Sequence, residues 1–559
     1  MSLTDRRAFM TYFSSLGLGA SLFPGTLWAR LAAGADISVD TVRCAEEIAG
    51  LSFAPDQREM MVEELTQQAK QLETLRAFRL PNELPPALLF DPVLPGMRIE
   101  AGSTKRARTR VAAPAVPANL EELAFLPVTA LSELLRRRKV TSVQLTRMYL
   151  DRLRRFDPTL KCVVTFTEER ALRHARAADE EIGRGKYRGP LHGVPWGAKD
   201  LLAAKGYPTT WGTAPFKDQV IDLDATVVRR LDEAGAVLVA KLTLGELAYG
   251  DVWFGGMTRN PWNTEQGSSG SSAGPASATA AGLVGFSIGS ETLGSISSPS
   301  TRCGATGLRP TFGRVPRTGA MALSWSMDKL GPLCRSVEDC ALVLEAIAGP
   351  DGHDLSVRDV PFAWDATRPL RSIRMGYVKS AFDADHPNKK WDDAALDVLR
   401  GLGASLVPVE IPDLPYNAMR PILTVEAAAA FDELTRSGRD KEMSRQTKQA
   451  WPNLFRAARF IPAVEYVNAN RLRTVAMQKW AELMRTVDVI VAPTFGTQLL
   501  ATNLTGHPAV ILPNGFRDDG TPVSLTFLGD LYRESTLCAA AHAYQRATRF
   551  HLAHPTLKV

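Results

Sequence analysis

The sequence predicts an α/β fold in which helices cover a largely buried sheet, and three observations support this prediction. Short apolar runs alternate with helical patterns between residues 120 and 559. The run 236–241 (AVLVAK) is too apolar for a strand with one solvated face. Between Gln266 and Ser300, glycine and serine fill 18 of 35 positions around an apolar block at 280–288. Apolar groups seek burial, so this stretch is predicted to be buried and not a flexible linker.

Composition narrows the class of protein. The chain has 559 residues, enough for two to four domains or one unusually large one, with 45% apolar and 23% charged residues. A net charge of +6, from 66 basic and 60 acidic residues, is too small and dispersed an excess to indicate nucleic-acid binding. None of the six cysteines forms a C-x-x-C pair or lies at metal-ligand spacing from a histidine. We therefore expect no metal, no cofactor and no nucleic-acid partner.

The N-terminus predicts an export signal at residues 1–35. An arginine pair at 6–7 resembles the twin-arginine pattern, an uncharged segment follows at 11–29, and 33–35 (AGA) offers a small-residue cleavage site. The alternatives are a chance arginine pair or an uncleaved anchor. Glycines and a proline interrupt the uncharged segment, which disfavours a stable membrane span in the mature form. We expect a periplasmic or secreted protein.

Residues 36–119 are predicted to be an N-terminal extension with a linker. Its elements are a helix at 56–78, a proline-rich stretch at 80–86 and a basic run at 105–110. A solvated linker explains the basic run better than an anionic partner does.

The globular core is predicted to cover 120–559. Its expected helices lie at 128–155, 168–184, 226–234, 336–348 and 534–548; its strands lie at 162–166, 236–241, 487–492 and 509–512; a loop leads into 194–200, and 413–485 is mostly helical.

Two short patterns offer a nucleophilic serine. Residues 285–289 (GFSIG) fit the G-x-S-x-G elbow of α/β-hydrolases around Ser287, although the residues after it are a poor helix start. Ser326 and Lys329 match S-x-x-K, but the required Lys-Thr-Gly-like element comes earlier in the chain instead of later.

A third pattern is a set of five segments in one order. They are 193–200 (GVPWGAKD), 269–274 (SGSSAG), 293–297 (LGSIS), 303–315 (CGATGLRPTFGRV) and 503–509 (NLTGHPA). Together they resemble the amidase signature family, whose members use a Ser–cis-Ser–Lys triad, over about residues 120–550. The resemblance implies one large amidase domain at 120–559, with a central mixed sheet covered by helices on both sides.

The resemblance also implies site residues. The nucleophile would be Ser295 and the base Lys199. Four serines compete as the bridging residue: Ser268, Ser269, Ser271 and Ser272. The spacing usual in the family, counted back from Ser295, selects Ser271. The backbone N–H groups of Thr292, Leu293, Gly294 and Ser295 would form the oxyanion hole.

Chemical reasoning supports the lysine independently. A serine hydroxyl is a weak nucleophile until a base takes its proton, and a lysine is a base only when neutral. Burial lowers a lysine pKa, and Lys199 lies between apolar residues at 194–196 and 201–202. Asp200 complicates this interpretation, because a structural ion pair is the alternative role for Lys199.

Departures from the family pattern concern the substrate. Leu293 stands where glycine is usual, Glu291 where aspartate is frequent, and Ser297 where an arginine often holds a substrate carboxylate. Arg302 could approach in its place. These departures predict a substrate that is neutral or largely apolar near the scissile bond. The resemblance also implies that the pocket walls come largely from the helical region 413–485.

The leading hypothesis is an amidase that hydrolyses a carbon–nitrogen bond through an acyl-enzyme on Ser295, with side activity on esters or carbamates open. The alternatives are an α/β-hydrolase-type esterase using Ser287, a catalytically silent binding protein, and a glutaminase like the A subunit of the glutamyl-tRNA amidotransferase. The expected partner is a small-molecule amide, and a homodimer is compatible with the sequence.

Overall fold

The computed structural model describes residues 37–49, 51–77, 81–82, 88–99 and 105–557. The export signal predicted at 1–35 lies outside these ranges. The division between an extension and a core at residue 119 stays a prediction.

A mixed sheet runs through the molecule, with parallel and antiparallel neighbours. In spatial order its strands are β1 (Val163–Phe166), β3 (Val237–Leu242), β2 (Pro195–Lys199), β8 (Phe286–Glu291), β10 (Lys329–Cys334), β9 (Thr306–Arg309), β14 (Ala509–Phe516), β15 (Pro522–Gly529), β13 (Val489–Pro493), β11 (Met375–Val378) and β12 (Leu406–Val409). Two small hairpins pair β4 (Val252–Trp253) with β5 (Gly256–Met257) and β6 (Arg259–Asn260) with β7 (Asn263–Gly267).

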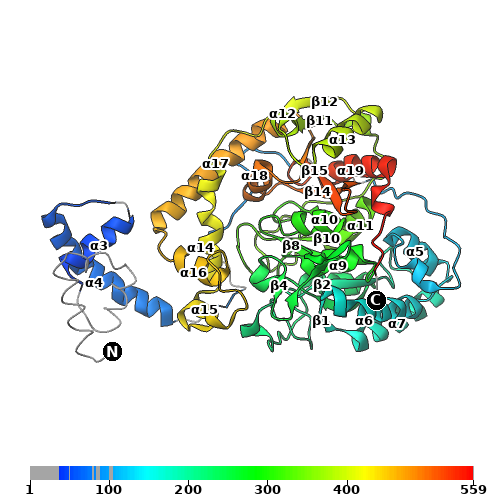
Figure 1. Ribbon diagram of the computed structural model, residues 1–559, viewed down its shortest axis with the longest axis horizontal. Coiled ribbons are helices and arrows are strands. Elements are labelled where there is room, and N and C mark those ends of the chain that lie inside the picture. Colours follow the sequence, from blue (N-terminus) through cyan, green and yellow to red (C-terminus); the bar gives the residue numbers. More distant parts are fainter. Residues whose placement is uncertain (1–36, 50, 78–80, 83–87, 100–104, 558–559) are drawn as a thin grey trace.

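Helices are the other main elements, and most of them surround the sheet (Figure 1). They are α3 (Val39–Ala49), α4 (Pro55–Ala77), α5 (Val128–Arg136), α6 (Ser142–Leu160), α7 (Glu168–Gly183), α8 (Thr226–Glu233), α9 (Ala273–Ala280), α10 (Ser297–Cys303), α11 (Val337–Ile347), α12 (Lys379–Asp383), α13 (Lys389–Gly401), α14 (Pro421–Ala430), α15 (Asp432–Arg436), α16 (Trp451–Ala458), α17 (Ala463–Met484), α18 (Thr497–Thr505) and α19 (Glu534–Thr548). The helices α3 and α4 lie at the left end of Figure 1, away from the sheet. Within the described ranges, no helix has the length and apolar character needed to cross a membrane.

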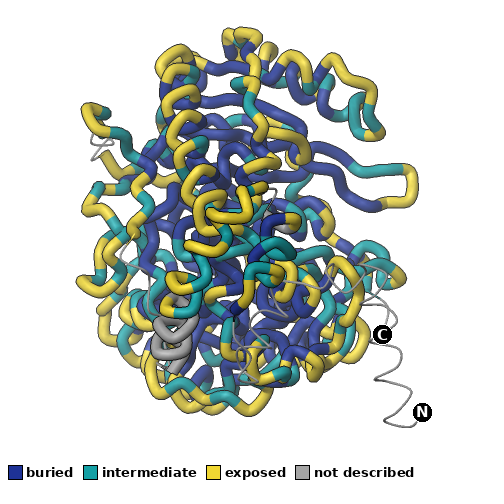
Figure 2. Tube along the Cα trace, turned by 90° about the vertical axis from the view of Figure 1, so that its left-hand side faces the viewer, coloured by how far each residue is buried: buried dark blue, intermediate teal, exposed yellow. Residues whose placement is uncertain are grey.

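Both faces of the sheet are covered, because successive side chains of a strand point to opposite faces. In β3, Leu238 packs in a cluster with residues of α5, α8 and α11, whereas Val237 and Val239 pack in another with residues of α6 and α7. Figure 2 shows buried chain through the centre of the molecule and exposed chain around it. The prediction of an α/β fold with a mixed sheet covered on both sides is confirmed.

One predicted helix was wrong. Residues 128–155 form two helices, α5 and α6, because a capping box starts α6: the Thr141 hydroxyl accepts the Gln144 N–H at 3.0 Å, and the Gln144 side chain accepts the Thr141 N–H at 2.8 Å. Arg138, with φ of +54°, turns the chain between the two helices.

The pairing of β2 and β8 positions the candidate site. These strands are parallel and in register at Ala198 and Ile288. Lys199, at the carboxyl end of β2, therefore lies beside the end of β8, which runs directly into residues 292–295. Ligands of α/β sheets commonly bind at such carboxyl ends.

Candidate active site

Lys199 is completely buried among hydroxyl groups. Its Nζ donates to Ser271 Oγ at 2.8 Å, to Ser290 Oγ at 2.8 Å and to Ser272 Oγ at 3.1 Å. None of the ion pairs within the described ranges involves Lys199. An ammonium group in water is much better solvated than one among three hydroxyls, so this environment favours the neutral amine.

The carboxylate next in sequence is bound elsewhere. Asp200 accepts from Lys241 Nζ at 2.6 Å and from the Thr210 N–H at 2.9 Å, and both ion-pair partners are fully buried. Successive residues at the end of a strand point to opposite faces, which separates Asp200 from the Lys199 amine. The structural ion pair considered for Lys199 and Asp200 is therefore not formed.

Burial lowers the pKa of Lys199 to about 7, while the carboxylates of Asp328 and Glu291 act in the opposite direction. About half of such a lysine is neutral near pH 7, which suits a general base at that pH.

Ser271 differs from the neighbouring serines. The peptide bond between Gly270 and Ser271 is cis, which is the conformation that the resemblance attached to the bridging serine. Of the competing residues, Ser268 donates to the carbonyl of Ser269, whose own hydroxyl pairs with that of Ser298. Ser272 contacts Lys199 but donates to the carbonyl of Ser290. Ser271 Oγ accepts from Lys199 at 2.8 Å, and its role as the bridging serine stays a prediction.

Ser295 lies in the turn between β8 and α10 and is 8% exposed. Its carbonyl accepts the N–H of Ser272 at 3.1 Å, whereas its hydroxyl makes no hydrogen bond to Ser271 within the described residues. Catalytic hydrogen bonds are often long before substrate binds. The N–H groups of residues 292–295 donate to no other described residue, and Gly294 has a φ of +81°. Four unused donors in one turn suit an oxyanion.

The Glu291 side chain fixes the turn that carries Ser295, a role that the sequence did not predict. Its Oε2 accepts the N–H groups of Ile296 at 2.9 Å and Ser297 at 2.8 Å, and Oε1 accepts from Arg309 at 2.8 Å. Burial alone would raise the pKa of Glu291, but Arg309 and other donors lower it to about 2. The signal in the sequence was that Glu291 is the one charge in a buried stretch, since buried charges need partners.

Ser290 is a second residue that sequence reasoning missed. It contributes a hydroxyl to Lys199 because β2 and β8 are neighbours, and no local pattern indicates that pairing.

The other candidate nucleophiles lie in structural hydrogen bonds. Ser287 is fully buried in the middle of β8, not in a strand-to-helix turn, and donates to the carbonyl of Pro275 at 2.9 Å. Ser326 donates to Glu426 at 2.7 Å and accepts from Arg473 at 2.9 Å. The Lys329 amine makes no hydrogen bond to another described residue.

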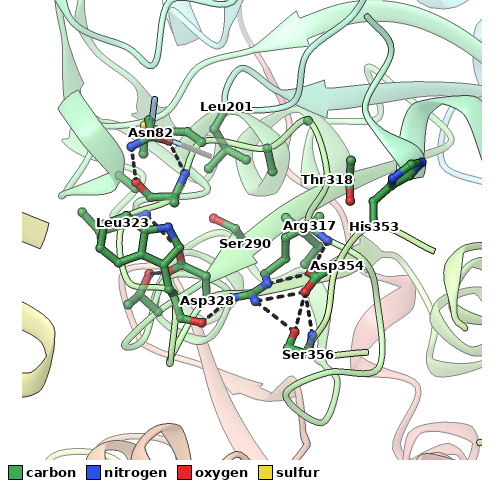
Figure 3. Close-up of a pocket in the computed structure, with 18 of the residues that line it drawn as sticks. Asn82, Leu201, Ser290, Arg317, Thr318, Leu323, Asp328, His353, Asp354 and Ser356 are labelled. Carbon is green, nitrogen blue, oxygen red and sulfur yellow. Dashed lines mark hydrogen bonds and ion pairs between the residues drawn. The ribbon is translucent and has the colours of Figure 1, made fainter. Parts of the chain in front are cut away.

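A cavity of about 520 Å³ opens beside Lys199 and includes Ser290 and Thr292 in its wall (Figure 3). No residue of the region 413–485 lines this cavity, and the expectation that this region supplies walls of the substrate pocket stays a prediction. The walls come from an N-terminal segment, namely residues 81–82 and 88–90, and from loops around residues 201–223, 312–330 and 353–356. Arg302 is not among the lining residues and donates instead to Gln266 at 3.0 Å.

Similar proteins are found by comparison of both sequence and structure. A sequence model of the family described as Amidase matches residues 144–502. The glutamyl-tRNA(Gln) amidotransferase A subunit of Geobacter metallireducens is 34% identical over 479 residues, which cover 77% of this chain and 99% of the relative. The native peptide amidase from Stenotrophomonas maltophilia superposes with a TM-score of 0.69 at 31% identity, covering 77% of this chain and 98% of that one.

Proposed function

The chain belongs to the amidase signature family, and we propose that it is an amidase that hydrolyses an uncharged amide through an acyl-enzyme on Ser295. One observation carries the proposal: the Lys199 amine is buried among the hydroxyls of Ser271, Ser272 and Ser290, and its pKa is about 7. A lysine held this way is prepared to accept a proton at neutral pH.

The proposed reaction proceeds in two halves. The Ser295 Oγ attacks the amide carbon while its proton passes through the Ser271 hydroxyl to Lys199 Nζ. The N–H groups of residues 292–295 stabilise the resulting oxyanion. The carbon–nitrogen bond breaks as the amine takes a proton back from Lys199 through Ser271. Water then attacks the acyl-enzyme by the same relay, which releases the acid and restores Ser295.

Replacement of Ser295 or Lys199 by alanine tests this assignment. Either change is expected to lower the hydrolysis of p-nitroanilides by on the order of 10³-fold or more with an unchanged circular dichroism spectrum. Labelling by a fluorophosphonate should be lost in Ser295→Ala. Ser277→Ala is the matched control, because this buried hydroxyl donates to the carbonyl of Arg259. Full turnover by Ser295→Ala would reject the proposal, and loss of labelling in Ser287→Ala instead would favour the esterase alternative.

A glutaminase subunit is the second candidate, favoured by the amidotransferase relative. Glutamine carries two charges, whereas the cavity beside Lys199 is lined mainly by apolar side chains. We expect a higher kcat/KM for neutral amides than for glutamine, measured as ammonia release. The opposite order would replace the amidase proposal by this one.

We further propose export by the twin-arginine route to the periplasm or the medium, with the arginine pair at 6–7 and the uncharged segment at 11–29 as support. Export of the full chain should fail when Arg6 and Arg7 are both replaced by lysine. If cell fractionation finds the native protein and the double lysine variant equally in the cytoplasm, the export proposal is contradicted.

A further inference from the structure

The cavity beside Lys199 is mostly apolar, and its Arg317, Asp328 and Asp354 side chains already have hydrogen-bond partners within the protein. Arg317 donates to Asp354 at 3.0 Å and to Ser356 at 2.9 Å, as Figure 3 shows. Asp328 accepts from the Thr292 hydroxyl at 2.5 Å and from the Leu323 N–H at 2.8 Å. A charged substrate group would have to break these pairs in a buried place, so the cavity suits an uncharged group.

One wall of the cavity comes from the N-terminal segment, which precedes the residues that the family model matches. Asn82 attaches it: Nδ2 donates to the carbonyl of Ala322 at 2.9 Å, and Oδ1 accepts the Ala322 N–H at 2.7 Å (Figure 3). The Asn82 amide thus bonds both the N–H and the carbonyl of Ala322, as a paired residue of a neighbouring β-strand does.

The segment is attached again at Phe90, which itself lines the cavity. The ring of Phe90 meets that of Phe312 edge-on, with centroids 5.0 Å apart, and the Arg473 guanidinium lies 3.4 Å from the Phe90 centroid. Asp91 forms an ion pair with Arg358. Phe90 and Asp91, which directly follow Leu88 and Leu89, therefore attach these leucines to the core beside the cavity.

Four leucines around this cavity are unusually exposed. Leu88 and Leu89 of the N-terminal segment are 75% and 51% exposed, and Leu223 and Leu355 on other loops are 42% and 70% exposed. Large apolar side chains gathered at one opening mark a ligand-binding surface. Ser290, which lines the same cavity, is hydrogen-bonded to Lys199.

We propose that Leu88 and Leu89 complete a binding subsite for a long apolar substituent of the amide substrate, with Leu223 and Leu355 on the other loops. The subsite rests on the proposed amidase function, since the link between this cavity and the Lys199 cluster is Ser290. A substituent that reaches the leucines covers them from water, whereas a short one does not. The N-terminal segment thus selects substrates by length.

Two substrate series test the subsite in the full chain. One varies the acyl group of p-nitroanilides from acetyl to dodecanoyl, and the other varies the alkylamine of acetamides over the same lengths. In the native protein kcat/KM should rise by about fourfold for each added methylene that is buried. In Leu88→Ser/Leu89→Ser it should fall by about tenfold for the long members only. The responding series identifies the side of the scissile bond that occupies the cavity.

Leu552→Ser is the matched control, because this leucine is half exposed and does not line the cavity. Its chain-length profile should equal the native one. The subsite proposal is overturned if the double variant keeps the native profile in both series, or loses activity equally at every length.

Binding separates the subsite from the reaction. Dodecanamide should bind the Ser295→Ala protein in isothermal titration calorimetry, and about tenfold more weakly when Leu88 and Leu89 are also serine. If dodecanamide binding differs in this way but the native protein hydrolyses no amide, the amidase proposal is rejected and the subsite proposal stands. Equal binding by both proteins would reject the subsite.

Discussion

Arg309 donates to Glu291 across 2.8 Å, and both side chains are completely buried beneath the turn that carries Ser295. The other oxygen of Glu291 accepts the N–H groups of Ile296 and Ser297. An ion pair thus sets the backbone path on both sides of the proposed nucleophile, and the hydroxyl of Ser297 joins it at 2.9 Å. The positive charge of this ion pair is Arg309 of β9. Ser297, where relatives often have an arginine, contributes only a neutral hydroxyl.

Removal of this cation should be strongly destabilising. Arg309→Met leaves Glu291 buried without its ion-pair partner, and we expect the free energy of unfolding to fall by about 3–5 kcal/mol in urea denaturation. Arg302→Met is the control, because Arg302 makes one exposed hydrogen bond to Gln266 and should change stability by less than about 1 kcal/mol. Equal stability of the two variants would show that the Glu291 pair contributes little.

The same pair predicts a dependence of stability on acid. The folded-state pKa of Glu291 is about 2, below its ordinary value of 4.5. Its contribution to stability is therefore present above about pH 4.5 and is lost as the pH falls toward 2. In Arg309→Met the pKa of Glu291 rises, so this part of the acid dependence should disappear from unfolding curves recorded between pH 5 and pH 2. An unchanged acid dependence would mean that other groups produce it.

The pH dependence of turnover should report Lys199. A lysine with a pKa of about 7 becomes neutral as the pH rises, so kcat/KM should increase through about pH 7 and level off above it. The measurement is hydrolysis of a neutral anilide from pH 5 to pH 9, with re-assay at pH 8 to exclude inactivation. A midpoint near the ordinary lysine value would contradict the role of Lys199 as base.

Sequence patterns predicted the elements and residues that local chemistry determines. The last helix was predicted at 534–548 and occupies those residues as α19. The contact of Lys199 with Ser271 joins residues that the family motifs already identified. The break between α5 and α6 was missed because the basic run 136–139 (RRRK) across it consists of good helix formers, and the capping box at Thr141 was overlooked.

The cavity walls could not be predicted, because they depend on contacts between distant loops. Asn82 bonds to Ala322 across 240 positions of sequence, and no local pattern signals that pairing. The same holds for Ser290, which reaches Lys199 through the pairing of β2 with β8. Burial of Glu291 could be inferred from sequence, but not the identity of Arg309 as its partner.

Substrate charge should matter strongly. Arg317 is occupied by Asp354, and the Asp328 carboxylate also lines the cavity, so a carboxylate on the substrate finds no free cation there. An aryl amide should have a kcat/KM at least about tenfold higher than that of its ω-carboxylate analogue, through KM. A preference for the acid would overturn this interpretation of Ser297 and of the cavity.

The turn at Gly294 offers the sharpest test of the oxyanion assignment. Gly294 has a φ of +81°, and the nearest atom to an added Cβ would be Leu499 Cδ2 at 3.6 Å, so alanine fits but strains the backbone. Gly520, with a φ of +78° and open space around it, is the matched control. Each alanine should lower the free energy of unfolding by about 1–2 kcal/mol. Only Gly294→Ala should also lower kcat, by about 10²-fold, because relaxation of the strain turns the N–H groups of residues 292–295 away from the oxyanion. Native kcat in Gly294→Ala would remove this turn from the proposed mechanism.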